Sequence, residues 1–107
     1  MNNDRINNRY SSYAKILMDG LPGYMRDISS DGFKYVTILP MTVLKGDVKQ
    51  ITIIPQDTSF DSFQLSGEIR WIKEESEGFQ VCGIRITEFK SDQYKNSYKE
   101  LQNRFSS

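Results

Sequence analysis

The strongest constraint on the fold is a two-residue alternation of side chains, interrupted at short intervals by turn-forming residues. In AKILMD, Ala14, Ile16 and Met18 alternate with Lys15 and Leu17. Successive side chains of a β-strand point to opposite faces, so this pattern predicts a strand with one buried face. A chain of several such segments buries its apolar faces by pairing the strands into a sheet or barrel.

Six segments are expected to be strands, and the links between them are short and turn-like. They are residues 11–19, 24–28, 33–39, 48–54, 63–72 and 79–89. GLPG at 20–23 is expected to form the first turn, and Gly32 is expected to supply a positive φ in the second. Gly67 predicts a bulge or bend in the fifth strand. The pattern predicts a mainly β fold, either an antiparallel meander or a small six-stranded antiparallel β-barrel.

The end of the chain changes to a helical period. Ser91 is a suitable N-cap, and the apolar side chains that follow recur on one helix face. They are Tyr94, Tyr98, Leu101 and Phe105. We expect a C-terminal α-helix at 91–105 that docks on the barrel, with a dimer contact as the alternative use of this face. The 107 residues suit one domain, with a mobile N-terminal arm at 1–10 and the barrel at 11–89.

Composition excludes several classes of function. Lysine plus arginine equals aspartate plus glutamate at 14 each, which argues against a DNA-binding or RNA-binding surface. There is no histidine and one cysteine, so zinc chemistry, Ser–His catalysis and an internal disulfide are not expected. No apolar run is long enough for a membrane span, and the polar start does not resemble a signal peptide. We expect a soluble cytoplasmic protein that is not an enzyme and has no cofactor.

Two short motifs suggest a binding site for an anion. RINNR at 5–9 places Arg5 and Arg9 four residues apart, and each guanidinium can donate a pair of hydrogen bonds to phosphate or to a guanine edge. DISSDG at 27–32 offers the Asp27 carboxylate, the Ser29 hydroxyl and Gly32 at the junction of a strand and a turn. Each motif alone is more often a solvated terminus or an ordinary turn. Together, in this order and in a chain that is expected to form a barrel, the two motifs indicate a binding site more strongly than either does alone.

This combination resembles the PilZ domain family, the bacterial receptor module for cyclic di-GMP. RxxxR, DxSxxG, a split-type antiparallel barrel and a closing helix carry the resemblance, and GEIRWI at 67–72 and CGIRITEF at 82–89 are similar to two further family strands. The resemblance implies that Arg5 and Arg9 bind phosphate and guanine edges. It also implies that Asp27, Ser29 and Gly32 form the guanine pocket.

The resemblance further implies a receptor that binds cyclic di-GMP and relays the signal to an unidentified effector protein, in control of motility, surface properties or virulence. We expect a monomer or a weak homodimer. Many family members have another basic residue at the position of Asp4. The Asp4 carboxylate is instead expected to oppose binding of the anion. One alternative is a PilZ-like adaptor that acts through protein contacts without ligand. A less favoured alternative is a small barrel that binds single-stranded nucleic acid.

Other conspicuous residues are expected to be structural. Trp71 lies on the apolar side of its strand and is expected in the core, and Cys82 is expected to be a small core residue. Arg26 should lie on the opposite face from Asp27 and be solvated. The acidic residues Glu74, Glu75 and Glu77 are expected to form a solvated turn rather than a metal site.

Overall fold

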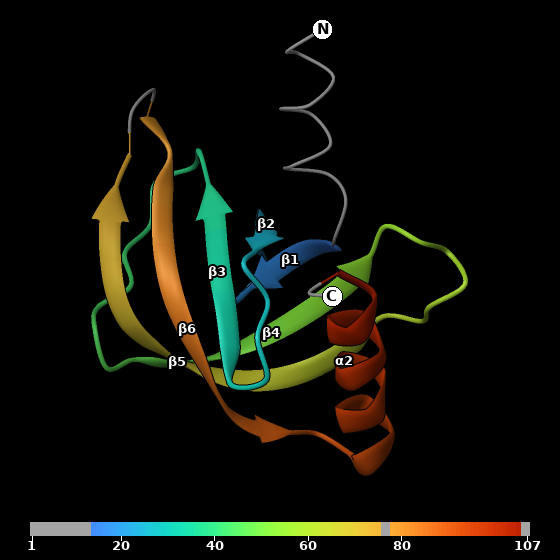
Figure 1. Cartoon of the computed structure of the whole chain (residues 1–107). Coiled ribbons are helices and arrows are strands. Elements are labelled where there is room, and N and C mark those ends of the chain that lie inside the picture. The colour runs from blue at the N-terminus through green and yellow to red at the C-terminus, as the bar shows by residue number, and fades with distance from the viewer. Residues whose placement is uncertain (1–13, 76–77, 106–107) are drawn as a thin grey trace, which may run out of the picture.

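Strands dominate the computed structural model, which describes residues 14–75 and 78–105 (Figure 1). The elements are β1 (Ala14–Met18), β2 (Leu21–Arg26), β3 (Gly32–Thr37), β4 (Val48–Pro55), β5 (Phe63–Glu74), β6 (Gln80–Phe89) and α2 (Asp92–Phe105). The expected bounds of the last four strands differ from these by at most two residues. The expected mainly β fold with a C-terminal helix is confirmed.

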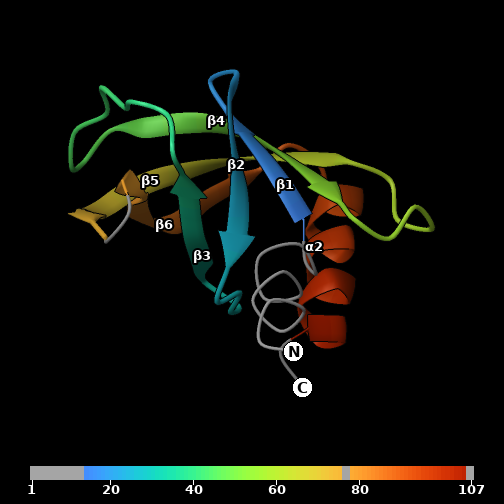
Figure 2. The same cartoon turned by 90° about the horizontal axis from the view of Figure 1, so that it is seen from above.

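The strands close into an antiparallel barrel in the order β1-β2-β3-β6-β5-β4. Because β3 pairs with β6 and β1 pairs with β4, the alternative of a meander is wrong. The segment between β3 and β4 carries the chain across the barrel, as Figure 2 shows. Alternation predicts which face of a strand is buried but not which strand lies beside it, so the sequence left both arrangements open.

The hairpin between β1 and β2 is tighter than the sequence suggests. Asp19 and Gly20 both have positive φ, at 50° and 85°, and they connect Met18 directly to its partner Leu21. Two residues with positive φ make the turn that best matches the twist of a hairpin. The predicted turn at 20–23 and the predicted start of the second strand are therefore wrong, because β2 begins at Leu21.

The longest strands, β5 and β6, curve along the barrel in Figure 1. Their register shifts between Ser66 and Gly67, which confirms the predicted irregularity at Gly67. It shifts again between Ile69 and Trp71. Such bulges increase the local bend and twist of a strand and change which way the following side chains point.

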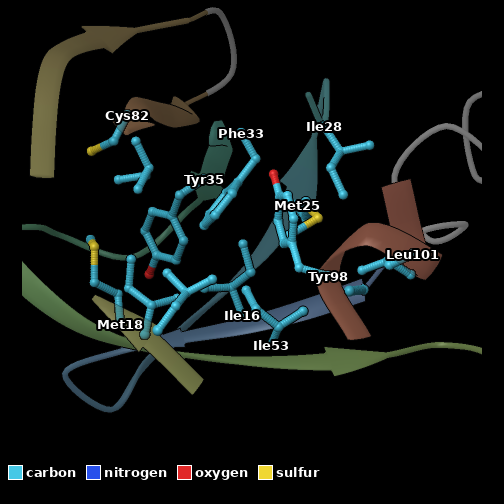
Figure 3. Packing of buried hydrophobic residues seen from close by; sticks show 14 of the residues in the cluster. Ile16, Met18, Met25, Ile28, Phe33, Tyr35, Ile53, Cys82, Tyr98 and Leu101 are labelled. Atoms are coloured by element: carbon cyan, nitrogen blue, oxygen red, sulfur yellow. The ribbon is translucent and has the colours of Figure 1, made fainter. Parts of the chain in front are cut away.

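The core fills the barrel and continues under α2 (Figure 3). Tyr35, Leu65 and Ile69 are fully buried among the strands, and Tyr98 and Leu101 seal one end from the helix. The helix begins as predicted, because the Ser91 hydroxyl oxygen accepts a hydrogen bond from the Tyr94 N–H at 3.2 Å. The docking of this helix on the barrel is confirmed. Within the described ranges, no helix has the length and apolar character to cross a bilayer.

Candidate functional site

A shallow hollow of about 260 Å³ lies where β2 ends and β3 begins. The turn between these strands lines one side of it, and the middle of β5 and β6 lines the other. The lining residues are Asp27, Ser29, Asp31, Gly32, Phe33, Lys34, Arg70, Trp71, Gly83, Ile84 and Arg85. Three of the predicted ligand-binding residues, Asp27, Ser29 and Gly32, therefore share one surface. The other two, Arg5 and Arg9, lie outside the residues that the structure describes.

Asp27 ends β2 by leaving the strand conformation. Its φ is 53°, in the left-handed region that Asp and Asn occupy more readily than most side chains. The Asp27 carboxylate lies on the surface, and its Oδ2 is 2.7 Å from the Lys34 ammonium. The turn therefore presents a carboxylate that is exposed and paired with one lysine.

Hydrogen bonds within the turn close it between Ser29 and Gly32. The Ser29 N–H donates to the Gly32 carbonyl oxygen at 2.9 Å, and the Ser29 hydroxyl donates to the same oxygen at 3.2 Å. The Ile86 N–H donates to the Asp31 carbonyl at 2.8 Å and joins the turn to β6. Ser29 thus serves the shape of the turn in this structure.

Gly32 is needed for space rather than for backbone freedom. The prediction of a positive φ at Gly32 is wrong, because the residue with positive φ at this junction is Asp27. A Cβ atom on Gly32 would overlap the carbonyl oxygen of Ile84 in the paired strand β6. Only glycine therefore allows β3 to start so close to β6.

Trp71 lies in the hollow, so its predicted place in the core is wrong. Its side chain is 40% exposed. The register shift between Ile69 and Trp71 breaks the strict alternation, so Trp71 no longer points inward with Ile69. The indole packs directly over Gly83, where any Cβ atom would overlap the ring. The sequence gives no local sign of this bulge, and Gly83 becomes informative only once its pairing with Trp71 is known.

The Trp71 indole shares the hollow with positively and negatively charged side chains. The Lys34 ammonium lies 5.9 Å from the centroid of the Trp71 ring and also contacts Asp27. Arg70 and Arg85 line the same hollow, and Arg70 has a long contact of 3.7 Å with Glu68. A flat aromatic face, a carboxylate acceptor and guanidinium donors together suit a planar, hydrogen-bonding and anionic ligand.

Arg26 and Cys82 have structural roles, and Glu77 lies outside the residues that the structure describes. Arg26 is not solvated as expected, because its guanidinium lies 3.2 Å from the Glu75 carboxylate and its side chain is only 16% exposed. Glu75 lies in the connection that follows β5, where its side chain is 34% exposed, and its ion pair with Arg26 ties this connection to β2. Cys82 is buried as predicted, and burial raises the pKa of its thiol to about 11. Among the described residues, no group of acidic and cysteine side chains could hold a metal ion.

A larger hollow of about 440 Å³ lies elsewhere on the barrel. Apolar groups dominate its lining, which includes Pro22, Tyr24, Ile38 and Leu39. Lys15 is the one charged residue among those that line it. Its lining has no carboxylate that could accept hydrogen bonds from a purine edge and no guanidinium, and the Lys15 ammonium is its one charged donor for a phosphate. Size alone does not make it the better site.

Comparisons with known proteins agree with this architecture. Among solved structures, that of the Bacillus subtilis Inhibitor of motility (MotI/DgrA) is similar, with a TM-score of 0.70 and 11% sequence identity. The match covers 88% of this chain but only 47% of that one, and at this identity it shows the fold alone. No curated protein matches the sequence. The family model for the PilZ domain matches residues 2–102. Because that match spans nearly its whole length, the chain belongs to the PilZ domain family.

Proposed function

We propose that this chain is a receptor for cyclic di-GMP and that it binds the ligand without catalysing a reaction. Membership of the PilZ domain family supports this proposal. The observation that carries it is the composition of the hollow, where the Asp27 turn, the Trp71 indole and two arginines lie together. Each of these groups matches a different part of a cyclic dinucleotide.

Asp27 is proposed to accept hydrogen bonds from the N1 and N2 donors of one guanine. Its pairing with Lys34 has to loosen or be shared, because a guanine edge uses both carboxylate oxygens. The two side chains are 58% and 36% exposed, so the ion pair is well solvated. Exposed ion pairs contribute at most about 1 kcal/mol, so this rearrangement is not a large barrier to binding.

Trp71 is proposed to stack on a guanine base. Its indole is held over Gly83 and remains 40% exposed, so one face is supported and part of the ring is accessible. Stacking of a base on an aromatic side chain contributes about 1–3 kcal/mol. Lys34 near the ring adds a positive charge beside the same base.

The phosphates are proposed to bind guanidinium groups. The family match spans Arg5 and Arg9, which carry the RxxxR motif, and Arg70 and Arg85 line the hollow itself. Since the net charge of the chain is zero, this attraction is local rather than a property of the whole surface. Asp4 beside Arg5 is expected to weaken it slightly.

The signal is proposed to pass to a partner protein in the bacterial cytoplasm. A binding module that changes no bond in its ligand can act only through a change in its own contacts. The similar fold of the Bacillus motility inhibitor makes motility the first output to examine. The alternative is an adaptor that acts without ligand. In that case binding of the partner protein would not depend on Asp27 or Arg9.

Calorimetric titration of cyclic di-GMP into the wild-type protein, Arg9→Ala and Asp27→Ala tests the proposal. Charge-assisted hydrogen bonds contribute about 1.5–3 kcal/mol, so each substitution is expected to weaken binding about tenfold or more. Asp61→Ala is the matched control, because it removes an exposed carboxylate from the loop between β4 and β5. Its affinity is expected to equal that of the wild type. Absence of binding to the wild type, or equal affinities in all four proteins, would contradict the proposal.

A further inference from the structure

The turn that carries Asp27 and Ser29 is anchored from beneath as well as within itself. The Ile28 side chain is buried in the core with only 6% of its surface exposed. On the same side, the hydroxyl of Tyr98 reaches the turn from helix α2, although the two segments are far apart in the sequence. Figure 3 places Ile28 and Tyr98 in the same cluster of core residues.

The Tyr98 hydroxyl contacts two backbone carbonyls of the turn. It donates toward the Ser29 carbonyl oxygen at 2.5 Å and lies 3.0 Å from the Gly32 carbonyl oxygen. These are the two residues whose mutual hydrogen bonds close the turn. One hydroxyl thus fixes both ends of the segment that follows Asp27.

The ring that carries this hydroxyl is held on several sides. Tyr98 is 1% exposed, and its ring centroid lies 6.4 Å from those of Phe33 and Phe63 and 5.6 Å from that of Phe89. Close packing restricts the ring to one orientation, so the hydroxyl has a fixed position. Burial and the nearby Asp31 carboxylate raise its pKa, so the hydroxyl keeps its proton and remains a donor near neutral pH.

We infer that Tyr98 is a positioning residue for the ligand-binding turn, and that it couples docking of α2 to occupancy of the hollow. The hydroxyl holds the Ser29 and Gly32 carbonyls and thereby sets the direction in which Asp27 presents its carboxylate. Because binding linkage is reciprocal, a ligand that favours this shape of the turn also stabilises the docked helix. The inference rests on the proposed function where it concerns ligand affinity, and on the structure alone where it concerns the turn.

Tyr98→Phe tests the inference, and Tyr35→Phe is a closely matched control. Tyr35 is also fully buried, and its hydroxyl also donates to backbone carbonyls, at 2.8 Å to Leu21 and 3.3 Å to Pro22. Both variants keep the ring and lose one buried hydroxyl, so a purely structural effect is common to them. Calorimetry with cyclic di-GMP is expected to show at least about a fivefold loss of affinity for Tyr98→Phe and less than about a twofold change for Tyr35→Phe.

Amide hydrogen exchange without ligand provides the second readout. The Ser29 N–H is bonded to the Gly32 carbonyl, so its exchange rate reports how often the turn opens. At equal global stability, adjusted with urea, Tyr98→Phe is expected to speed exchange at Ser29 about tenfold relative to Tyr35→Phe. Equal exchange rates at Ser29 in the two variants would overturn the role of Tyr98.

The two readouts separate this inference from the proposed function. If the wild type does not bind cyclic di-GMP, the proposed function fails, and hydrogen exchange alone still decides whether Tyr98 holds the turn. If the wild type binds and the two variants lose affinity equally, the proposed function stands and the coupling through Tyr98 is refuted. If Tyr98→Phe loses affinity for cyclic di-GMP while Tyr35→Phe does not, and if Ser29 exchanges faster in Tyr98→Phe, both the proposed function and the role of Tyr98 are supported.

Discussion

Two glycines shape the candidate site by leaving room for neighbouring groups. Gly32 lets the start of β3 approach the Ile84 carbonyl, and Gly83 lets the Trp71 indole pack directly on the backbone of β6. A side chain at either position would displace a group that lines the hollow. The shape of the site therefore depends on the absence of a side chain at these two glycines as much as on the side chains that line the hollow.

Trp71→Ala is expected to weaken binding of cyclic di-GMP by about 5-fold to 150-fold, because base stacking contributes about 1–3 kcal/mol. Ile72→Ala is the matched control: Ile72 follows directly in β5, is 42% exposed against 40% for Trp71, and does not line the hollow. Titration of both variants measures the effect. A loss of affinity that is the same in both would show that Trp71 does not stack on the ligand.

Residues that act together could be grouped from the sequence only where they are close in the chain. Asp27, Ser29 and Gly32 lie in one turn, so their shared surface follows from the hexapeptide itself. Trp71 could not be added, because a bulge before it reverses the expected direction of its side chain. The pairing of Arg26 with Glu75, 49 residues apart, likewise depends on the closed barrel.

The elements of this fold were more predictable than their arrangement. Alternation and turn residues located all of the described strands, and the Ser91 cap located the helix. The predicted turns were wrong at two places where a positive φ changes the course of the backbone. These are the two-residue turn of Asp19 and Gly20, and Asp27, which ends β2. Pairing of β3 with β6 belongs to the strand order of the barrel, which alternation does not encode.

The pairing of β3 with β6 is expected to be sensitive to Gly32→Ala. The added methyl group would meet the Ile84 carbonyl, which belongs to the backbone and cannot move aside as a flexible side chain can. Overpacking of this kind lowers the free energy of unfolding by about 1–3 kcal/mol. Urea denaturation measures the change. Ser30→Ala, at an exposed position in the same turn, is expected to stay within about 0.5 kcal/mol of the wild type.

A Gly32→Ala protein as stable as the wild type would contradict the close approach of the two strands. If both alanine variants lost the same stability, the turn itself, rather than the contact with Ile84, would be the sensitive feature.

For the whole molecule, the buried core should make the fold sensitive to alkali. Burial raises the pKa of Cys82 from 9.0 to about 11, and burial is also the main reason that the pKa of Tyr35 rises to about 12. Above pH 9 the unfolded chain loses the thiol proton while the folded protein keeps it, so unfolding becomes more favourable. The contribution of Cys82 is complete below pH 9 and is lost between pH 9 and 11, at about 1.4 kcal/mol per pH unit at most.

Urea denaturation at several pH values measures this loss of stability. The wild type is expected to lose stability more steeply between pH 9 and 10 than Cys82→Ala, which has no thiol to ionise. Parallel declines in the two proteins would show that the thiol of Cys82 does not contribute to the alkaline sensitivity.

Amide NMR spectra of the wild-type protein, recorded during titration with cyclic di-GMP, show whether the ligand binds in the hollow beside Asp27. Among the residues that the structure describes, the largest shifts are expected on 27–34, 70–71 and 83–85, which surround the Asp27 turn and Trp71. The apolar hollow at Tyr24, Ile38 and Leu39 is the internal comparison, and its signals are expected to move little. Shifts centred on that apolar hollow, or no shifts at all, would show that cyclic di-GMP does not bind beside Asp27.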